Sequence, residues 1–315
     1  MKTAEDIKAI ALPPRQTGRW DSRRSQTVVG YLFLAPTLLF FAVFLVVPLG
    51  FSLFISFSSW SGFDLTSIEW VGLQNYKDIL SKDSAFLTPI LTNTLYFAFG
   101  TVLLSFVAAV IVAYMITRLK FEGFWRTLYF LPMVTTVVAV GNVWKFMYDP
   151  NGGLINAVLN RLGMPTIAFL DNPDTALTSI VVVSAWAAIG SAVLILTAGL
   201  KGIPESYYEA AELEGASVSK MFWHITLPLL RPSMLFVLIT GLISGLQSFT
   251  LTMVMTGDGG PGNATNVGGL EMYNQAFQYS AWGIACAMAF ILFIIVFVVT
   301  AIQLMIFRRG GVESY

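Results

Sequence analysis

The chain is organised around residues 205–232, ESYYEAAELEGASVSKMFWHITLPLLRP, its longest charged and structured interruption between apolar runs. Helix-forming residues dominate positions 205–214, and Pro204 precedes them, a residue favoured in the first turn of a helix. Gly215 is typical of a helix C-cap, and Ser217 can cap a second helix. We therefore expect a helix-turn-helix hairpin between two membrane spans, ended by Pro228 and Pro232.

The second helix of this hairpin is amphipathic. Its apolar residues recur at the i, i+3, i+4 and i+7 positions that form one helix face: Val218, Met221, Phe222 and Ile225. Such a stripe suits a hairpin that lies at the membrane interface, and it equally suits an element that docks on a partner protein. The pattern alone leaves both interpretations open.

The composition is that of a polytopic membrane protein. Hydrophobic residues make up 56% of the 315 residues, charged residues only 11%, and the mean hydropathy is +0.72. The formal net charge is zero, so no nucleic-acid partner is indicated. The single cysteine, Cys286, lies in an apolar run and cannot form an internal disulfide, so we interpret it as a packing residue.

Six apolar runs are each long enough to cross a hydrocarbon core of about 30 Å as a helix. They predict an all-α membrane domain over residues 28–307, with tails at 1–27 and 308–315. The first run is long for a signal peptide, lacks a clear cleavage site, and could be broken near Pro48. The expected spans are 28–57, 90–117, 127–148, 176–200, 233–256 and 282–307.

Lysine and arginine predict the orientation of these spans. If the N-terminus is cytoplasmic, 14 of the 18 Lys and Arg residues fall on the cytoplasmic side, whereas Asp and Glu divide evenly. Both termini and the 205–232 hairpin are then expected to be cytoplasmic.

Few polar residues interrupt the spans, and these are the candidate solute path. Gly241 and Gly245 could let neighbouring helices approach closely there. Interhelical hydrogen bonding is the alternative role for each polar residue. The candidates are Asn142, Trp144, Gln247, Ser248 and Thr250.

Few residues in the sequence suit ion coupling, nucleotide binding or metal binding. No Asp or Glu is expected deep in a span, which disfavours a proton or ion relay. No P-loop pattern for nucleotide phosphates is present. The only histidine, His224, offers no metal site and is interpreted as a surface or docking residue.

The hairpin resembles the conserved cytoplasmic loop, the EAA loop, of ABC importer permeases. That pattern is E-A-A, three residues, G, nine residues, I, one residue, then L-P, and it is matched in full. One neighbouring residue differs, since Glu214 stands where the group usually has Asp. In that family the loop is the coupling helix, which sits in a cleft of the ATPase. The resemblance thus assigns coupling to Glu209, Ala210, Ala211, Gly215, Ile225, Leu227 and Pro228.

Other segments resemble the carbohydrate group of these permeases, and the first of its two unlike subunits. The similar segments are Gly72–Tyr76 with Asn93-Thr94, Leu131-Pro132 with Trp144, Gly152–Asn156, and Thr256–Pro261 with Thr265, Tyr273 and Phe277. A large periplasmic insertion found in the enterobacterial maltose subunit is lacking.

This resemblance implies a multi-pass permease subunit of a bacterial cell-membrane importer that moves a sugar by alternating access. The implied partners are a second homologous permease, two ATPase subunits and an extracytoplasmic solute-binding protein. No cofactor is expected in this chain, since ATP and Mg would bind the ATPase, and the chain itself is not expected to be an enzyme. An importer for glycerol phosphate or a polyol, and an ATP-independent secondary transporter, are the alternatives.

Overall fold

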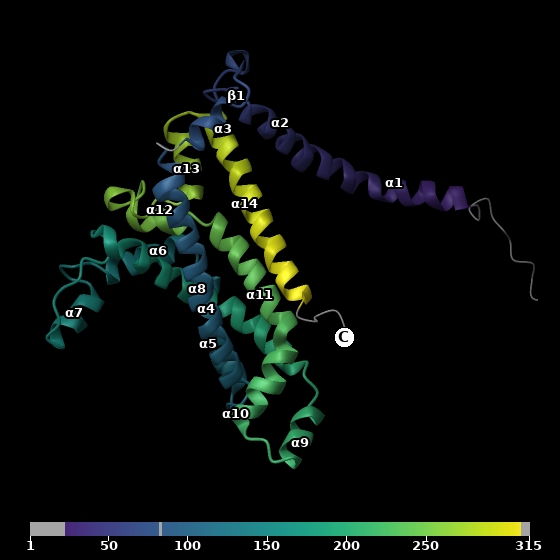
Figure 1. The fold of residues 1–315 in the computed structure, drawn as a ribbon, viewed down its shortest axis with the longest axis vertical. Coiled ribbons are helices and arrows are strands. Elements are labelled where there is room, and N and C mark those ends of the chain that lie inside the picture. The colour runs from purple at the N-terminus through teal and green to yellow at the C-terminus, as the bar shows by residue number, and fades with distance from the viewer. Residues whose placement is uncertain (1–22, 82–83, 310–315) are drawn as a thin grey trace, which may run out of the picture. The chain divides into compact units, whose positions relative to one another are not determined.

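The computed structural model describes residues 23–81 and 84–309, and these fall into two units that divide between residues 52 and 53 (Figure 1). In the first unit, α1 (Arg23–Phe41) continues through a π-helical turn (Ala42–Val46) into α2 (Val47–Ser56), whose last four residues belong to the second unit. No break occurs near Pro48, because the wider π turn directly before it accommodates the missing N–H. The predicted tails fall largely outside the described residues, and α1 already begins at Arg23.

The second unit holds four continuous apolar helices that lie side by side (Figure 1). Three of them confirm predicted spans, the third in chain order covers only the first part of the span predicted at 233–256, and all four have the length and hydropathy expected of a membrane crossing. The π-helical turn Phe86–Ile90 precedes the first of them. The helices are α4 (Leu91–Ile116), α8 (Pro173–Lys201), α11 (Leu227–Gln247) and α14 (Trp282–Arg309).

Buried clusters show how these helices run. Near one end, Phe97 of α4 packs with Ile180 of α8, and near the other end Ala113 packs with Leu196. The two helices are therefore parallel. Leu230, early in α11, joins the second cluster, so α11 runs antiparallel to both. The hairpin lies at this second end, which we call the hairpin end (Figure 1).

The third predicted span is not one helix. Residues 127–148 were expected as a single crossing, but α5 (Glu122–Val134) and α6 (Val137–Met147) meet at a bend of 95°. The bend lies at Thr135 and Thr136, whose backbones are extended, and the Thr136 hydroxyl caps α6 by accepting from the Ala139 N–H at 3.4 Å. The prediction failed because apolar composition does not show where a run changes direction.

The fifth predicted span is interrupted, as its polar residues indicated. Helix α11 ends at Gln247, Ser248 is extended, and α12 (Thr250–Thr256) follows after Phe249. At its other end this span begins within the hairpin, because α10 (Val218–Met221) passes through a π turn (Phe222–Thr226) into α11. The expectation that Pro228 and Pro232 end the hairpin is therefore wrong. Pro228 comes directly after the π turn, whose wider spacing tolerates a residue without an N–H, and Pro232 lies inside α11 without ending it.

The loops at the end opposite the hairpin, which we call the outer end, carry short elements, and polar residues of the motifs hold them in place by hydrogen bonds. Asn75 donates to the carbonyl oxygens of Ser56 and Ser58, each at 3.0 Å, and the Gly268 N–H donates to the Thr94 hydroxyl at 2.8 Å. The short elements are β1 (Ser58–Ser59) paired antiparallel with β2 (Glu69–Trp70), the turn Leu65–Ser67, α3 (Gln74–Ile79), α7 (Leu154–Arg161), the turn Pro261–Asn263, α13 (Gly268–Tyr273) and a π turn (Asn274–Gln278). The all-α class is thus confirmed, with one small sheet added.

The closest contact between α5 and α8 gives a stability prediction. A Cβ on Gly190 would lie 2.3 Å from the Tyr129 carbonyl oxygen, which is backbone and cannot swing away. We expect Gly190→Ala to cost about 1–3 kcal/mol and to lower the melting temperature of the purified protein by several degrees.

Gly50→Ala is the matched control, because this helical glycine of α2 has no heavy atom within 4 Å of its Cβ position. It should melt at or slightly above the parental temperature. Equal melting of both variants would show that the α5–α8 contact is looser than described.

Candidate functional site

The hairpin begins with α9 (Ser206–Leu213), which ends in a Schellman motif. The Gly215 N–H donates to the Glu212 carbonyl and the Ala216 N–H to the Ala211 carbonyl, both at 2.9 Å. Gly215 has φ +74°, as the C-cap prediction required, and Ser217 caps α10 by accepting from the Lys220 N–H. The motif residues from Glu209 to Gly215 thus form a helix and the turn that aims it.

The hairpin surface is unusually apolar for an exposed element. Leu213 is 90% exposed and Trp223 63% exposed, and Val218 is also exposed. Of the predicted apolar stripe, Met221 is buried and Phe222 and Ile225 are half-buried. Val218 is the one residue of the stripe that is exposed. Exposed apolar groups of this kind mark a contact surface.

The residues of the E-A-A motif differ in how far they are exposed. Glu209 and Ala210 are exposed, whereas Ala211, Leu227 and Pro228 are half-buried against the rest of the hairpin. His224 is exposed, and its Nδ1 lies 3.0 Å from the Lys220 carbonyl oxygen. A partner surface can therefore reach Glu209 without any rearrangement of the hairpin.

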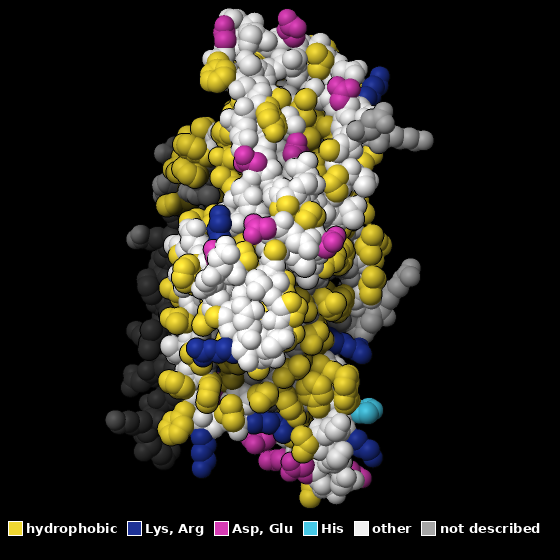
Figure 2. All heavy atoms as spheres, turned by 90° about the vertical axis from the view of Figure 1, so that its left-hand side faces the viewer, with side chains coloured by type: hydrophobic (Ala, Val, Ile, Leu, Met, Phe, Trp, Pro, Cys, Tyr) yellow, Lys and Arg dark blue, Asp and Glu magenta, His cyan; other side chains and the backbone are white. Residues whose placement is uncertain are grey.

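One contact holds the hairpin together, and another joins it to the helix bundle. Within the hairpin the Tyr208 and Thr226 hydroxyls lie 3.0 Å apart, and the Phe222 ring packs edge-on against Tyr114 of α4 with centroids 4.7 Å apart. Lysine and arginine side chains are frequent around this end (Figure 2). Movement of the hairpin would therefore be felt directly by α4 and α11.

Charged residues also join the helices that flank the hairpin. Lys201, the last residue of α8, lies 2.8 Å from a carboxylate oxygen of Glu122 at the start of α5. The other Glu122 oxygen pairs with Arg126 one turn later. This trio holds the first half of the broken span to the helix that leads into α9. Beside it, an open groove of ≈ 740 Å³ runs along α9.

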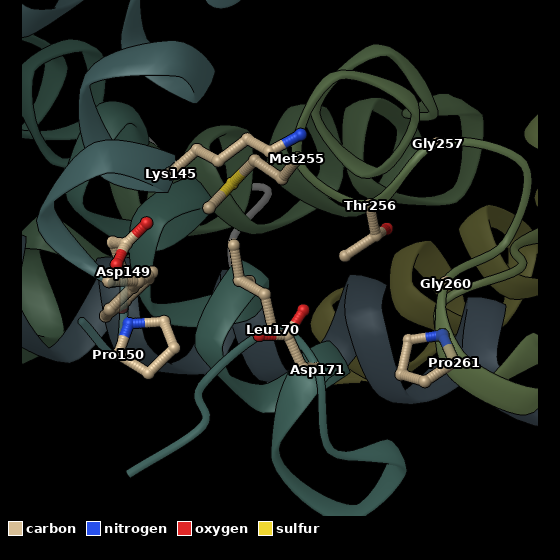
Figure 3. A pocket seen from close by; sticks show the side chains of 11 residues that line it. Lys145, Asp149, Pro150, Leu170, Asp171, Met255, Thr256, Gly257, Gly260 and Pro261 are labelled. Atoms are coloured by element: carbon tan, nitrogen blue, oxygen red, sulfur yellow. The ribbon is translucent and has the colours of Figure 1, made fainter. Parts of the chain in front are cut away.

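At the outer end, a cavity of ≈ 430 Å³ lies among three loops (Figure 3). Lys145 of α6, Asp149 and Asp171 supply its charged groups, and Thr256 with the glycine-rich loop forms the facing side. Asp149 is partly committed to structure, since it accepts the Asn151 N–H at 2.7 Å. The cavity is polar and open, and therefore suits a hydrated solute.

A second cavity, of ≈ 410 Å³, lies between α4, α8 and α11, and its mostly apolar lining carries seven hydroxyl residues. None of its lining side chains is charged. Gly245 brings α11 against α4 there, since its Cβ position lies 3.0 Å from the Ala98 Cα, as the glycine prediction anticipated. The hydroxyl residues are Thr101, Ser105, Ser184, Ser191, Thr240, Ser244 and Ser248. We call this space the hydroxyl cavity.

A smaller cavity of ≈ 200 Å³ lies between the two helix breaks. Thr135 and Val137 line it from the α5–α6 bend, and Ser248 and Leu251 line it from the α11–α12 interruption. Ser184 and Ser248 belong to both this cavity and the hydroxyl cavity. The two breaks thus face each other across connected space in the middle of the helix bundle, and we call this smaller space the break cavity.

The predicted path residues are only partly gathered. Ser248 lines both cavities, while Gln247 beside it is exposed and Thr250 is half-buried outside them. Asn142 is exposed on α6, and Trp144 packs against Trp186 with ring centroids 5.5 Å apart. The other hydroxyl residues were missed, although their helical spacing was a signal. They recur every four or seven residues, as Thr101 and Ser105, Ser184 and Ser191, and Thr240, Ser244 and Ser248 do.

Residues 102–310 match the family described as binding-protein-dependent transport system inner membrane component. YesP of Bacillus subtilis, a probable ABC transporter permease protein, is 36% identical over 89% of this chain and 91% of its own length. The trehalose/maltose transport system permease protein MalF of Thermococcus litoralis is 33% identical, over 89% and 95%. A chain of the bacterial alginate ABC transporter, solved with an alginate pentasaccharide-bound periplasmic protein, shares the fold, with TM-score 0.78 and 20% identity over 94% of this chain and 99% of that one.

The turn at Gly215 gives a local prediction. No heavy atom lies within 4 Å of its Cβ position, so a substitution there meets only the backbone strain of φ +74°. We expect Gly215→Val to cost at least about 1 kcal/mol, to loosen the hairpin, and to speed tryptic cleavage after Lys220 about fivefold.

Asn tolerates left-handed backbone, so Gly215→Asn should be cleaved almost as slowly as the parent. Cleavage of the Val and Asn variants at one common rate would contradict the proposed role of the turn.

Proposed function

This chain belongs to the family of binding-protein-dependent transport system inner membrane components, and we propose that it is one of two permease subunits of an ATP-driven saccharide importer. One observation carries the proposal: two broken helices meet at uncharged space whose mostly apolar lining carries several hydroxyl groups. Irregular backbone at membrane depth is tolerated where it is buried in protein or lines a cavity, and transporters use such sites for their solutes.

The lining of the cavities favours a neutral polyhydroxy solute. Hydroxyl groups donate and accept hydrogen bonds, and so can replace the water around the hydroxyls of a sugar. A glycerol phosphate would call for cationic groups or helix N-termini, and no cation lines the hydroxyl cavity. The trehalose/maltose name of a relative points the same way. A polyol fits the same lining and is the second solute class.

The hairpin is proposed to dock on an ATPase subunit that binds ATP and Mg. Glu209, exposed on α9, would meet a basic or donor group there, and Leu213 and Trp223 would bury their exposed apolar surface. In the described spans, Asp and Glu occur only in first turns, as Glu122 and Asp174, which gives little support to an ion-coupled secondary transporter.

Transport is proposed to run by alternating access with a second permease and an extracytoplasmic binding protein. Nucleotide binding can move the hairpin only if the ATPase surface binds one hairpin position better than the other. Because α10 continues into α11 through the π turn, such movement would reach Ser248 along one helix. Gln247, Thr250, Asn142 and Trp144 remain predicted contacts of the solute.

The docking role is tested by Glu209→Lys, which replaces attraction by repulsion at the proposed contact. We expect the reconstituted complex to retain less ATPase subunit and to lose most ATP hydrolysis that is stimulated by liganded binding protein. Glu69→Lys, the same charge change at an exposed site of β2, should keep both. Full stimulated hydrolysis in the Glu209 variant would remove the coupling assignment.

The charge distribution predicts the orientation in a bacterial cell membrane. A reporter fused after Arg309 should be cytoplasmic, and one inserted in residues 259–266 should be extracytoplasmic. Protease that reaches the 205–232 hairpin from outside intact cells would reverse this assignment.

The path is tested at Ser248, the predicted residue that lines both cavities. Ser248→Val fills their junction with two methyl groups and suits the extended backbone, so it should slow saccharide uptake several-fold while assembly persists. Ser248→Ala leaves the space open and should have a smaller effect. Unchanged uptake in the valine variant would place the path elsewhere.

A further inference from the structure

Five aromatic side chains form an unbroken row of ring contacts in the outer half of the second unit. Phe249 and Tyr273 have centroids 5.7 Å apart, and Tyr273 and Phe277 have centroids 4.9 Å apart. Phe277 to Trp282 is 5.1 Å, and Trp282 to Trp60 is 6.0 Å. We call these residues the aromatic row.

The aromatic row connects the helix break with the outer loops. Phe249 directly follows Ser248, which lines both the hydroxyl cavity and the break cavity. Trp60 follows β1, at the far outer end, whereas α12 lies nearer the middle (Figure 1). The row therefore advances along the length of the helices. Aromatic residues that anchor a protein at the membrane interface share one depth instead.

The rings remain accessible although they touch one another. Phe277 is 62% exposed, and the other four are half-buried. Phe249 and Tyr273 lie within 25° of parallel at a centroid separation of 5.7 Å, so their rings are offset rather than stacked face on face. Offset rings leave part of each face open to a third ring.

The backbone at Gly62 lies directly against Trp282 in the outer part of the row. A Cβ on Gly62 would lie 2.1 Å from the indole nitrogen of Trp282, and φ at Gly62 is +90°. The backbone N–H of Trp282 donates to the Trp60 carbonyl oxygen at 3.0 Å. These contacts hold Trp60 and Trp282 together across more than two hundred residues of sequence.

We propose that the aromatic row is a contact track for the sugar rings of an oligosaccharide passing between the outer loops and the helix break. This inference rests on the proposed saccharide import. Sugar rings have apolar C–H faces, which pack on the electron-rich faces of aromatic side chains. A series of similar, weak contacts lets a solute enter without being trapped at one site, as conduction requires. A row of rings suits a chain of sugars better than a single sugar.

The test removes the two central rings of the row. In the complex with the second permease, the ATPase and saturating binding protein, Tyr273→Ala with Phe277→Ala should lower uptake of a radiolabelled trisaccharide to pentasaccharide about tenfold. Uptake of a monosaccharide or disaccharide should fall less, because a short solute spans fewer rings. Tyr273→Phe with Phe277→Tyr keeps both rings and should retain uptake.

The matched control is a second aromatic pair on α14. Phe293 and Phe297 are both exposed, have ring centroids 6.5 Å apart and lie outside the row. Their double alanine variant should import every probe at the parental rate.

Three results would overturn the proposal. Parental import by the Tyr273/Phe277 alanine variant would show that the row does not contact the solute, with saccharide import itself intact. Loss of the second permease or the binding protein from that variant, measured by co-purification, would make the row an assembly surface. A parental complex that imports no saccharide from the mono- to pentasaccharide series would remove the proposed function and the track with it.

Discussion

Backbone hydrogen bonding inside a membrane is the constraint on which this structure depends. A spanning segment must satisfy its N–H and C=O groups internally, which forces helices, and any break must lie against protein or water rather than lipid. Two spans break here, at Thr135–Thr136 and at Ser248–Phe249, and both breaks line the same small cavity. Beside it, Gly245 of α11 approaches Ala98 of α4 closely at the hydroxyl cavity, which shares Ser184 and Ser248 with the smaller one. We therefore propose that the solute path passes the two breaks.

The hairpin is continuous with one of the two broken spans. Its second helix continues through the π turn at Phe222–Thr226 into α11, which runs without a break to Gln247. A force on α10 is thus carried along one helix to the cavity. The trio of Glu122, Arg126 and Lys201 holds the other broken span to the helix that leads into α9. Both broken spans are therefore tied to the surface on which an ATPase is proposed to act.

Local chemistry made the hairpin predictable. Gly215 and Ser217 are signals that act within one turn of helix, and the structure uses both as expected. The continuity through Pro228 was missed, because a π turn and tertiary packing outweighed the usual effect of proline. The bend at Thr135–Thr136 was missed for a similar reason: hydropathy measures how apolar a run is and not its direction. The hydroxyl cavity could not be predicted from the sequence, because it forms only where three helices pack together. The spacing of hydroxyl residues was nevertheless visible in each helix.

The central claim is that the two breaks face a water-filled path, and thiol accessibility tests it most directly. In a Cys286→Ala background, Thr135→Cys and Ser248→Cys would be exposed in vesicles to a charged, membrane-impermeant thiol reagent. Phe293→Cys, at an exposed position of α14 outside both cavities, is the reference. The account predicts that both break positions react, that Phe293→Cys does not, and that trapping the ATPase with nucleotide changes the rates at the breaks. Break positions that react no faster than Phe293→Cys would contradict it.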